Sequence, residues 1–152
     1  MTTPDENNTP RLTLRKGERL HHRTLVNALY SDGRGLYSYP LRLQWRALSR
    51  EQLEGSFRDE VPAGIDAVQM MITVPKKRQR HAVDRVLMRR RIREAYRLNR
   101  HQLLDEAAAS SGKATVSMAF VYISDQKCSY RKIEKAMRTL LTRLAEALNT
   151  PQ

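Results

Sequence analysis

The 152-residue chain holds a single cysteine, one tryptophan and two phenylalanines, and none of its apolar stretches approaches the roughly 20 residues of a membrane span. One cysteine cannot build an internal disulfide framework, so we expect Cys128 to be a buried, reduced side chain in a cytoplasmic protein. Residues 1–10 are polar and slightly acidic, unlike a signal peptide. The sequence predicts a disordered tail over residues 1–10 and one domain over residues 11–149.

Acidic residues are also scarce, with 16 Asp and Glu against 28 Lys and Arg and a formal net charge of +12. Residues 76–100 alone contain eleven of the cations and only two acids, Asp84 and Glu94. Charge this dense repels itself in a folded protein, whereas binding to a phosphate backbone releases counterions and is favourable. Because this run lacks Trp and Phe, a nucleic acid is favoured over a membrane surface as its partner.

The spacing of apolar residues predicts an α+β domain in the order helix, two or three strands, helix, strand, helix, with the helices packed on a mostly antiparallel sheet. Helices are expected at residues 19–32, 83–108 and 130–148, and a surface loop at 49–65. Strands are expected at residues 37–46, 67–74 and 116–123, with a short further strand at 77–81. Alternation over residues 37–46 assigns Tyr37 and Tyr39 to the apolar face, and Pro40 marks an edge or a break.

The helix over residues 83–108 is expected to have two different faces. At 100° per residue, one mostly apolar arc should pack on the sheet; it contains Met88, Ile92, Ala95, Tyr96, Asn99 and Leu103. A neighbouring arc about 100° wide carries only arginines and one valine: Val86, Arg89, Arg90, Arg93, Arg97 and Arg100. A planar guanidinium can bond two phosphate oxygens at once, and local acids are too few to neutralise the run. We therefore expect this arc to face solvent and to bind nucleic acid.

A catalytic site within the protein is not indicated. The four histidines, His21, His22, His81 and His101, have no partners at metal-ligand spacing. The loop acids form no spaced metal motif, and the chain has no glycine-rich phosphate loop. We expect no catalytic residue and no metal ligand in the protein alone.

The basic segment contains Val74-Pro75-Lys76-Lys77, then Ala82-Val83-Asp84-Arg85, then Arg89-Arg90-Arg91-Ile92-Arg93-Glu94. This pattern resembles the signature of the bacterial ribonuclease P protein subunit, in which a V-x-K-K turn precedes A-V-x-R-N-x-x-K-R-x-x-R-E. The resemblance covers about residues 12–148. Two departures stand out. The family's R-N-R triplet reads Arg85-Val86-Leu87 here, and Leu25 and Leu29 occupy positions where the family usually has aromatic residues.

The resemblance implies a ribosomal-protein-S5-domain-2-like fold with a left-handed βαβ crossover. It further implies a subunit of the ribonucleoprotein enzyme that removes the 5′ leader of precursor tRNA, with catalysis and Mg²⁺ binding carried by the RNA subunit. The basic segment would then bind that RNA through Lys76, Lys77, Arg78, Arg85, Arg89, Arg90, Arg93, Arg97 and Arg100. The leader would lie in a cleft between the sheet and the first helix, for which the candidates are Leu25, Leu29, Arg42, Gln44 and Arg46. Leu25 and Leu29 fit a purely structural place in the core equally well.

Two other functions remain open from the residues. A ribosomal or ribosome-assembly RNA-binding protein without enzymatic function would suit the same fold and charge, and the altered triplet is compatible with it. A DNA-binding regulator that places the basic helix in a major groove is weaker, because the sequence shows neither a helix-turn-helix pair nor a dimer seam.

Overall fold

The computed structural model describes residues 14–150. Its elements are η2 (Lys16–Glu18), α1 (Arg23–Asp32), β1 (Arg34–Ser38), β2 (Leu41–Leu48), α2 (Arg50–Gly55), β3 (Val68–Thr73), α3 (Ala82–Arg100), the π-helical segment η3 (His101–Asp105), α4 (Glu106–Ser110), β4 (Thr115–Tyr122) and α5 (Tyr130–Asn149). The predicted tail at residues 1–10 lies outside the described residues. No helix between residues 14 and 150 combines the length and the apolar character needed to cross a bilayer.

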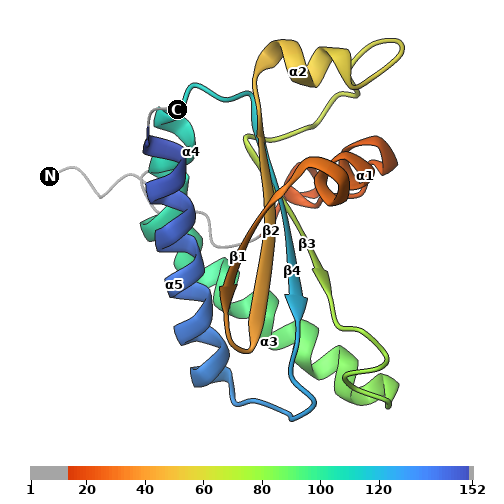
Figure 1. The fold of residues 1–152 in the computed structure, drawn as a ribbon, viewed down its shortest axis with the longest axis vertical. Coiled ribbons are helices and arrows are strands. Elements are labelled where there is room, and N and C mark those ends of the chain that lie inside the picture. Colours follow the sequence, from red (N-terminus) through yellow and green to blue (C-terminus); the bar gives the residue numbers. More distant parts are fainter. Residues whose placement is uncertain (1–13, 151–152) are drawn as a thin grey trace, which may run out of the picture.

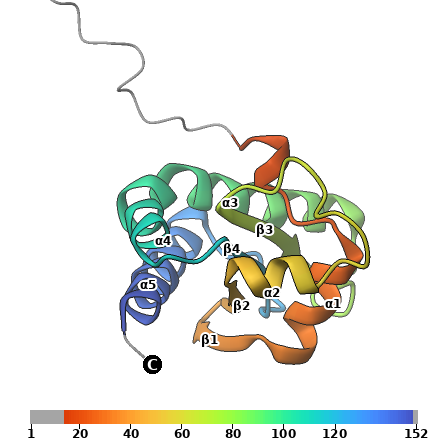
Figure 2. The same ribbon diagram turned by 90° about the horizontal axis from the view of Figure 1, so that it is seen from above.

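The four strands form one sheet in the order β1-β2-β4-β3. The β1–β2 and β2–β4 pairs are antiparallel, and β3 and β4 are parallel, so the predicted mostly antiparallel sheet is confirmed. The parallel pair is connected through α3. Figures 1 and 2 together show that this crossover is left-handed, the rarer sense for such a connection.

Helices cover the two faces of the sheet unequally. On one face α3 and α5 pack side by side (Figure 2) and enclose the larger core, which includes Leu43, Met118 and Phe120 from the strands. On the other face α1 covers a smaller core that contains Leu25, Leu29, Leu48, Leu53 and Ala119. Burial of large aliphatic and aromatic side chains on both faces supplies most of the drive for folding.

The strand predicted over residues 37–46 is in fact a hairpin. β1 and β2 are joined at Tyr39-Pro40, and Pro40 lies in the turn, where its missing N–H costs no ladder hydrogen bond. The turn reverses the chain, so Tyr37 pairs with Arg42 and shares its face of the sheet rather than that of Leu41. The register begins at Arg34 opposite Trp45, so the last three residues of β2 extend beyond β1 and pair only with β4.

Three further predicted boundaries were wrong. Residues 77–81 form a turn rather than a strand, closed by the N–H groups of Arg78 and Gln79, which donate to the Pro75 carbonyl. The loop at 49–65 contains α2, which Ser49 caps by accepting a hydrogen bond from the N–H of Gln52. The first helix begins at Arg23 rather than at residue 19, because the chain before it runs beside β3 as an isolated bridge.

The long helix predicted over residues 83–108 is divided by the wider turn η3. In a regular α-helix Leu104 would fall on the arginine arc of α3, eleven residues after Arg93. Each residue of a π-helical turn rotates less about the axis, so η3 turns Leu104 back to the core, where it is fully buried. The irregularity thus keeps an apolar side chain off the basic face.

Candidate nucleic-acid interface

The exposed face of α3 is built around Arg89, Arg90 and Arg93. Arg90 and Arg93 are exposed and Arg89 is half-buried. None of the three forms an ion pair with an acid among residues 14–150. On the opposite side of the helix Met88, Ile92 and other apolar residues anchor it to the core. The helix therefore presents guanidinium groups to solvent without carboxylates to neutralise them.

Arg97 lies on the same face but has a partner. Its Nε donates to an Oε of Glu94 over 3.2 Å, one turn earlier on the helix. This hydrogen bond raises the pKa of Arg97. Arg97 is therefore paired with a carboxylate on its own helix, unlike Arg89, Arg90 and Arg93.

Arg100 does not belong to the interface, and its assignment to the exposed arc was wrong. Its side chain is 8% exposed and forms an ion pair with Glu18 of η2, while its Nε lies 3.5 Å from an Oδ of Asp105. Burial lowers the pKa of Arg100, and the nearby Asp105 carboxylate opposes that shift. The last turn of α3 passes under η2, so this arginine fastens the N-terminal segment to the helix.

The turn that precedes α3 adds further cations. Lys76 and Lys77 are exposed, and Arg78 pairs with Asp125 over 3.3 Å. Arg85 is half-buried, and its Nη1 donates to the carbonyl oxygens of Gln79 and Arg80 at 3.0 and 2.8 Å. Arg85 therefore fixes the shape of this turn against the first turn of α3.

The altered triplet residues are accommodated in different ways. Val86 is exposed on α3, so it presents an apolar surface where the resembling family has an Asn. Leu87 is half-buried and packs against the larger core. Arg91, which lies off the arc, donates to the Cys128 carbonyl and joins α3 to the segment before α5. Leu87 and Arg91 thus have structural contacts. The structure does not explain why a valine stands at position 86.

The candidates on α1 and β2 do not form one cleft. Leu25 and Leu29 are 1% and 0% exposed, so they belong to the core and cannot contact a leader. Gln44 is half-buried and donates to the carbonyl oxygens of Leu29 and Gly33 at 3.3 and 3.4 Å, which completes the C-terminal end of α1. Arg42, by contrast, is exposed.

Two exposed tyrosines lie near these positions and were not among the predicted residues. Tyr30 on α1 is 45% exposed, and Tyr37 on β1 is 58% exposed directly opposite Arg42. Helical spacing could have identified Tyr30, since it falls one position after the buried Leu29. Tyr37 could be assigned to the same face of the sheet as Arg42 only if the turn at Pro40 was recognised.

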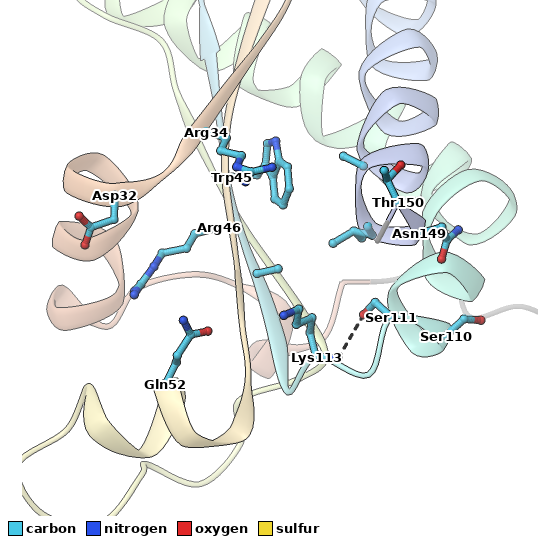
Figure 3. Close-up of a pocket in the computed structure, with 13 residues that line it drawn as sticks. Asp32, Arg34, Trp45, Arg46, Gln52, Ser110, Ser111, Lys113, Asn149 and Thr150 are labelled. Atoms are coloured by element: carbon cyan, nitrogen blue, oxygen red, sulfur yellow. Dashed lines mark hydrogen bonds between the residues drawn. The ribbon is translucent and has the colours of Figure 1, made fainter. Parts of the chain in front are cut away.

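Arg46 lines a cavity of about 820 Å³ at the end of the sheet where β2 extends beyond β1. Figure 3 shows Arg46 pointing toward α1 and α2, while Trp45 points to the other side, toward the end of α5. Arg34 lies over the Trp45 ring, with its Cζ 5.8 Å from the ring centroid. The exposed Lys113 also lines the cavity, so its charged side chains are Arg34, Arg46, Lys113 and the acid Asp32, among apolar and neutral polar residues.

No group of three or more His, Cys, Asp or Glu side chains is placed to hold a metal ion in the part of the chain that the structure describes. The acids nearest the basic face are already paired: Asp84 lies 3.5 Å from the Nζ of Lys127, and Glu94 bonds Arg97. The geometry of this face can bind a polyanion.

Comparison with known proteins agrees with this geometry. Residues 14–145 match the family Ribonuclease P. The ribonuclease P protein component of Porphyromonas gingivalis W83 is 36% identical over 145 residues, which are 95% of this chain and 92% of that protein. The corresponding protein of Chlorobium phaeobacteroides is 30% identical over 118 residues, 76% of this chain and 75% of the relative.

Solved structures share the fold at low identity. The Staphylococcus aureus RNase P protein has a TM-score of 0.57 at 15% identity, covering 87% of this chain and 98% of that one. The Thermotoga maritima RNase P protein, in complex with 1-(4-fluorophenyl)-2-thiourea, has a TM-score of 0.58 at 17% identity, covering 82% and 98%. Together with the sequence relatives, these findings show that the chain belongs to the ribonuclease P family as a protein component of that ribonucleoprotein, where its partner is the RNA subunit.

Proposed function

We propose that this protein binds the catalytic RNA subunit through the exposed arginines of α3 and the lysines of the preceding turn, while the RNA hydrolyses the phosphodiester bond that frees the 5′ leader of precursor tRNA. The observation that carries this proposal is the row Arg89, Arg90 and Arg93, which is anchored by a buried helix face and lacks acidic partners among the described residues. When such a row of arginines binds the phosphates of RNA, condensed counterions are released, and this release makes binding favourable.

Catalysis is assigned to the RNA in this proposal, in line with the place of the chain as a protein component of the ribonuclease P ribonucleoprotein. Mg²⁺ is bound by RNA in the holoenzyme. The protein raises the affinity for it by reducing repulsion between RNA segments, which favours the folded RNA that contains the Mg²⁺ sites. The holoenzyme works in the cytoplasm, where reducing conditions suit the buried thiol of Cys128.

The 5′ leader is proposed to cross the face of the sheet on which α1 packs, beside that helix. There Tyr37 offers an exposed ring for base stacking and Arg42 a cation for phosphate. Tyr30 offers a second exposed ring on α1. The aromatic function that the family places on the first helix would thus come from Tyr30 and Tyr37 instead of Leu25 and Leu29.

Reconstitution tests the proposal. The protein is mixed with a bacterial ribonuclease P RNA and precursor tRNA at low Mg²⁺, and cleavage at the 5′ end is compared with the RNA alone. A large increase in cleavage is expected. If the protein binds the RNA without increasing cleavage, a ribosomal or ribosome-assembly role is the better explanation.

A further inference from the structure

The outward side of α5 forms a second cationic surface, which the sequence analysis did not identify. Within about three turns it carries five exposed cations: Arg131, Lys132, Lys135, Arg138 and Arg143. The opposite side of the helix is buried in the larger core through Ile133, Met137, Leu140 and neighbouring residues. We call these five residues the α5 basic strip.

Neighbouring elements hold three members of the strip in place. The Nζ of Lys132 lies 4.9 Å from the ring centroid of Tyr39, and Arg138 donates to the Oδ1 of Asn99 over 2.8 Å. Arg143 donates to the Tyr37 carbonyl over 3.2 Å. None of these contacts neutralises charge, and each leaves further N–H donors free. The strip is thus pre-positioned while its charge remains available.

Arg131 and Lys135 are the other two residues of the strip. They form no ion pair or side-chain hydrogen bond with the residues that the structure describes. They border a shallow groove of about 490 Å³ that runs along the N-terminal half of the helix. The nearby acid, Glu134, is already engaged: it accepts hydrogen bonds from Asn99 and Tyr130 at 3.1 and 2.9 Å. Its carboxylate forms no ion pair with Arg131 or Lys135, although it interacts electrostatically with Arg138.

The strip adjoins the basic face of α3. Asn99 of α3 bonds both Glu134 and Arg138 of α5. Arg97 and Glu94 of α3 lie close enough to Tyr130 to influence it electrostatically. The two cationic rows therefore lie on either side of the α3–α5 seam, which carries the acids Glu94 and Glu134, and each helix presents its own row of side chains.

We propose that the α5 basic strip is a second RNA-binding surface, which grips the phosphate backbone of a segment of the RNA subunit other than the one held by α3. This inference rests on the proposed function. The row from Arg131 to Arg138 spans about 10 Å along the helix, enough to follow several phosphates of one strand. The groove beside Arg131 and Lys135 is lined by polar and charged side chains alone, with no apolar side chain that would insert into a lipid surface, which favours RNA over a membrane.

The test compares three double or triple variants of the full chain for binding to a bacterial ribonuclease P RNA across a salt series. R131Q/K135Q removes the two unpaired cations of the strip. R50Q/R58Q removes the same charge from α2 and the segment after it, at the opposite end of the molecule from the N-terminal half of α5 (Figure 1). R89Q/R90Q/R93Q reports on the α3 surface.

R131Q/K135Q is expected to reduce the magnitude of the slope of log K against log salt by about 1.4 to 1.8, because each lost phosphate contact contributes about 0.7 to 0.9. The matched control R50Q/R58Q should retain the parent slope. In hydroxyl-radical footprints, R131Q/K135Q should lose protection at nucleotides that R89Q/R90Q/R93Q leaves protected.

Two results would overturn the inference. One is an R131Q/K135Q slope equal to that of R50Q/R58Q while R89Q/R90Q/R93Q still weakens binding, which leaves the proposed function intact. The other is loss of protection at the same nucleotides as the α3 variant, which would mean one shared RNA segment. If R89Q/R90Q/R93Q also binds like the parent, the proposed function itself fails.

Discussion

Arg100 and Glu18 form an ion pair in the protein interior, although they lie on elements that are far apart in the sequence and both belong to a strongly charged chain. The two side chains are 8% and 2% exposed. An arginine at this position looks like part of a phosphate-binding face when only the helical spacing is considered. The pair instead joins η2 to the end of α3.

Replacing Arg100 with Met should therefore destabilise the protein without specifically weakening RNA binding. Removal of one partner leaves Glu18 buried without its main counter-charge, and such losses cost about 3–5 kcal/mol. Urea unfolding followed by circular dichroism measures the change. The double variant R100M/E18L should recover much of the stability; a double variant as unstable as R100M would contradict the buried pair.

Replacing Arg89, Arg90 and Arg93 with Gln should weaken binding to the RNA subunit. The magnitude of the slope of log K against log salt should fall by about 0.7 to 0.9 for each lost phosphate contact. Unfolding in urea should change little, because these side chains have no ion pair with a described residue. The binding measurement is a filter or fluorescence titration at several salt concentrations. An unchanged slope would remove these residues from the interface.

Tyr37→Ala should reduce the affinity of the holoenzyme for leader-bearing tRNA more than for mature tRNA. Loss of one stacked base costs about 1–3 kcal/mol, or roughly five- to 150-fold in affinity. Arg42→Ala should act in the same direction. Equal losses on both substrates would place the two residues outside the path of the leader.

Leu25→Ala serves as the contrast to these two variants. Because Leu25 is buried in the smaller core, its truncation should cost about 2–5 kcal/mol of folding free energy. At a temperature where the variant is folded, it should not discriminate between leader-bearing and mature tRNA. Selective loss of the leader-bearing substrate would show that α1 contacts the leader through this side chain after all.

Glu134→Gln should lower stability in a pH-dependent way. Hydrogen bonds from Asn99 and Tyr130 hold the pKa of Glu134 below its ordinary value of 4.5. A carboxylate whose pKa is depressed in the folded protein stabilises the folded state at pH values above its ordinary pKa. This contribution is lost as the pH falls through the pKa that the group has in the folded protein. At pH 7 the variant should be less stable by about 1 kcal/mol. The difference should shrink below pH 4; a constant difference in urea unfolding at pH 7 and pH 3.5 would contradict the network.

Local periodicity predicted α3, β4 and α5 well, because each has a regular apolar pattern that tertiary contacts reinforce. It failed where a distant residue decides the environment. The position of Arg100 around the helix axis gives no information about Glu18, which forms an ion pair with it from η2. The single strand predicted across Pro40 placed Tyr37 on the wrong face because one reversed turn changes which residues share a side of the sheet.

The candidate cleft was harder to predict for a related reason. Leu25 and Leu29 have the same helical spacing whether they face a ligand or a second core, and only the packing of α1 on Leu48 and Ala119 distinguishes the two. The α5 basic strip was overlooked because its cations are spread along a helix whose apolar stripe dominated the pattern.

The overhang of β2 beyond β1 leaves the backbone of its last residues without a neighbouring strand on one side. Such an edge can recruit a strand from another molecule and begin aggregation. Here the edge lies beside the cationic side chains of Arg34, Arg46 and Lys113. Repulsion between these charges on two copies disfavours contact between their open edges. We therefore expect the excess of positive charge to oppose aggregation of chains that have not yet bound RNA.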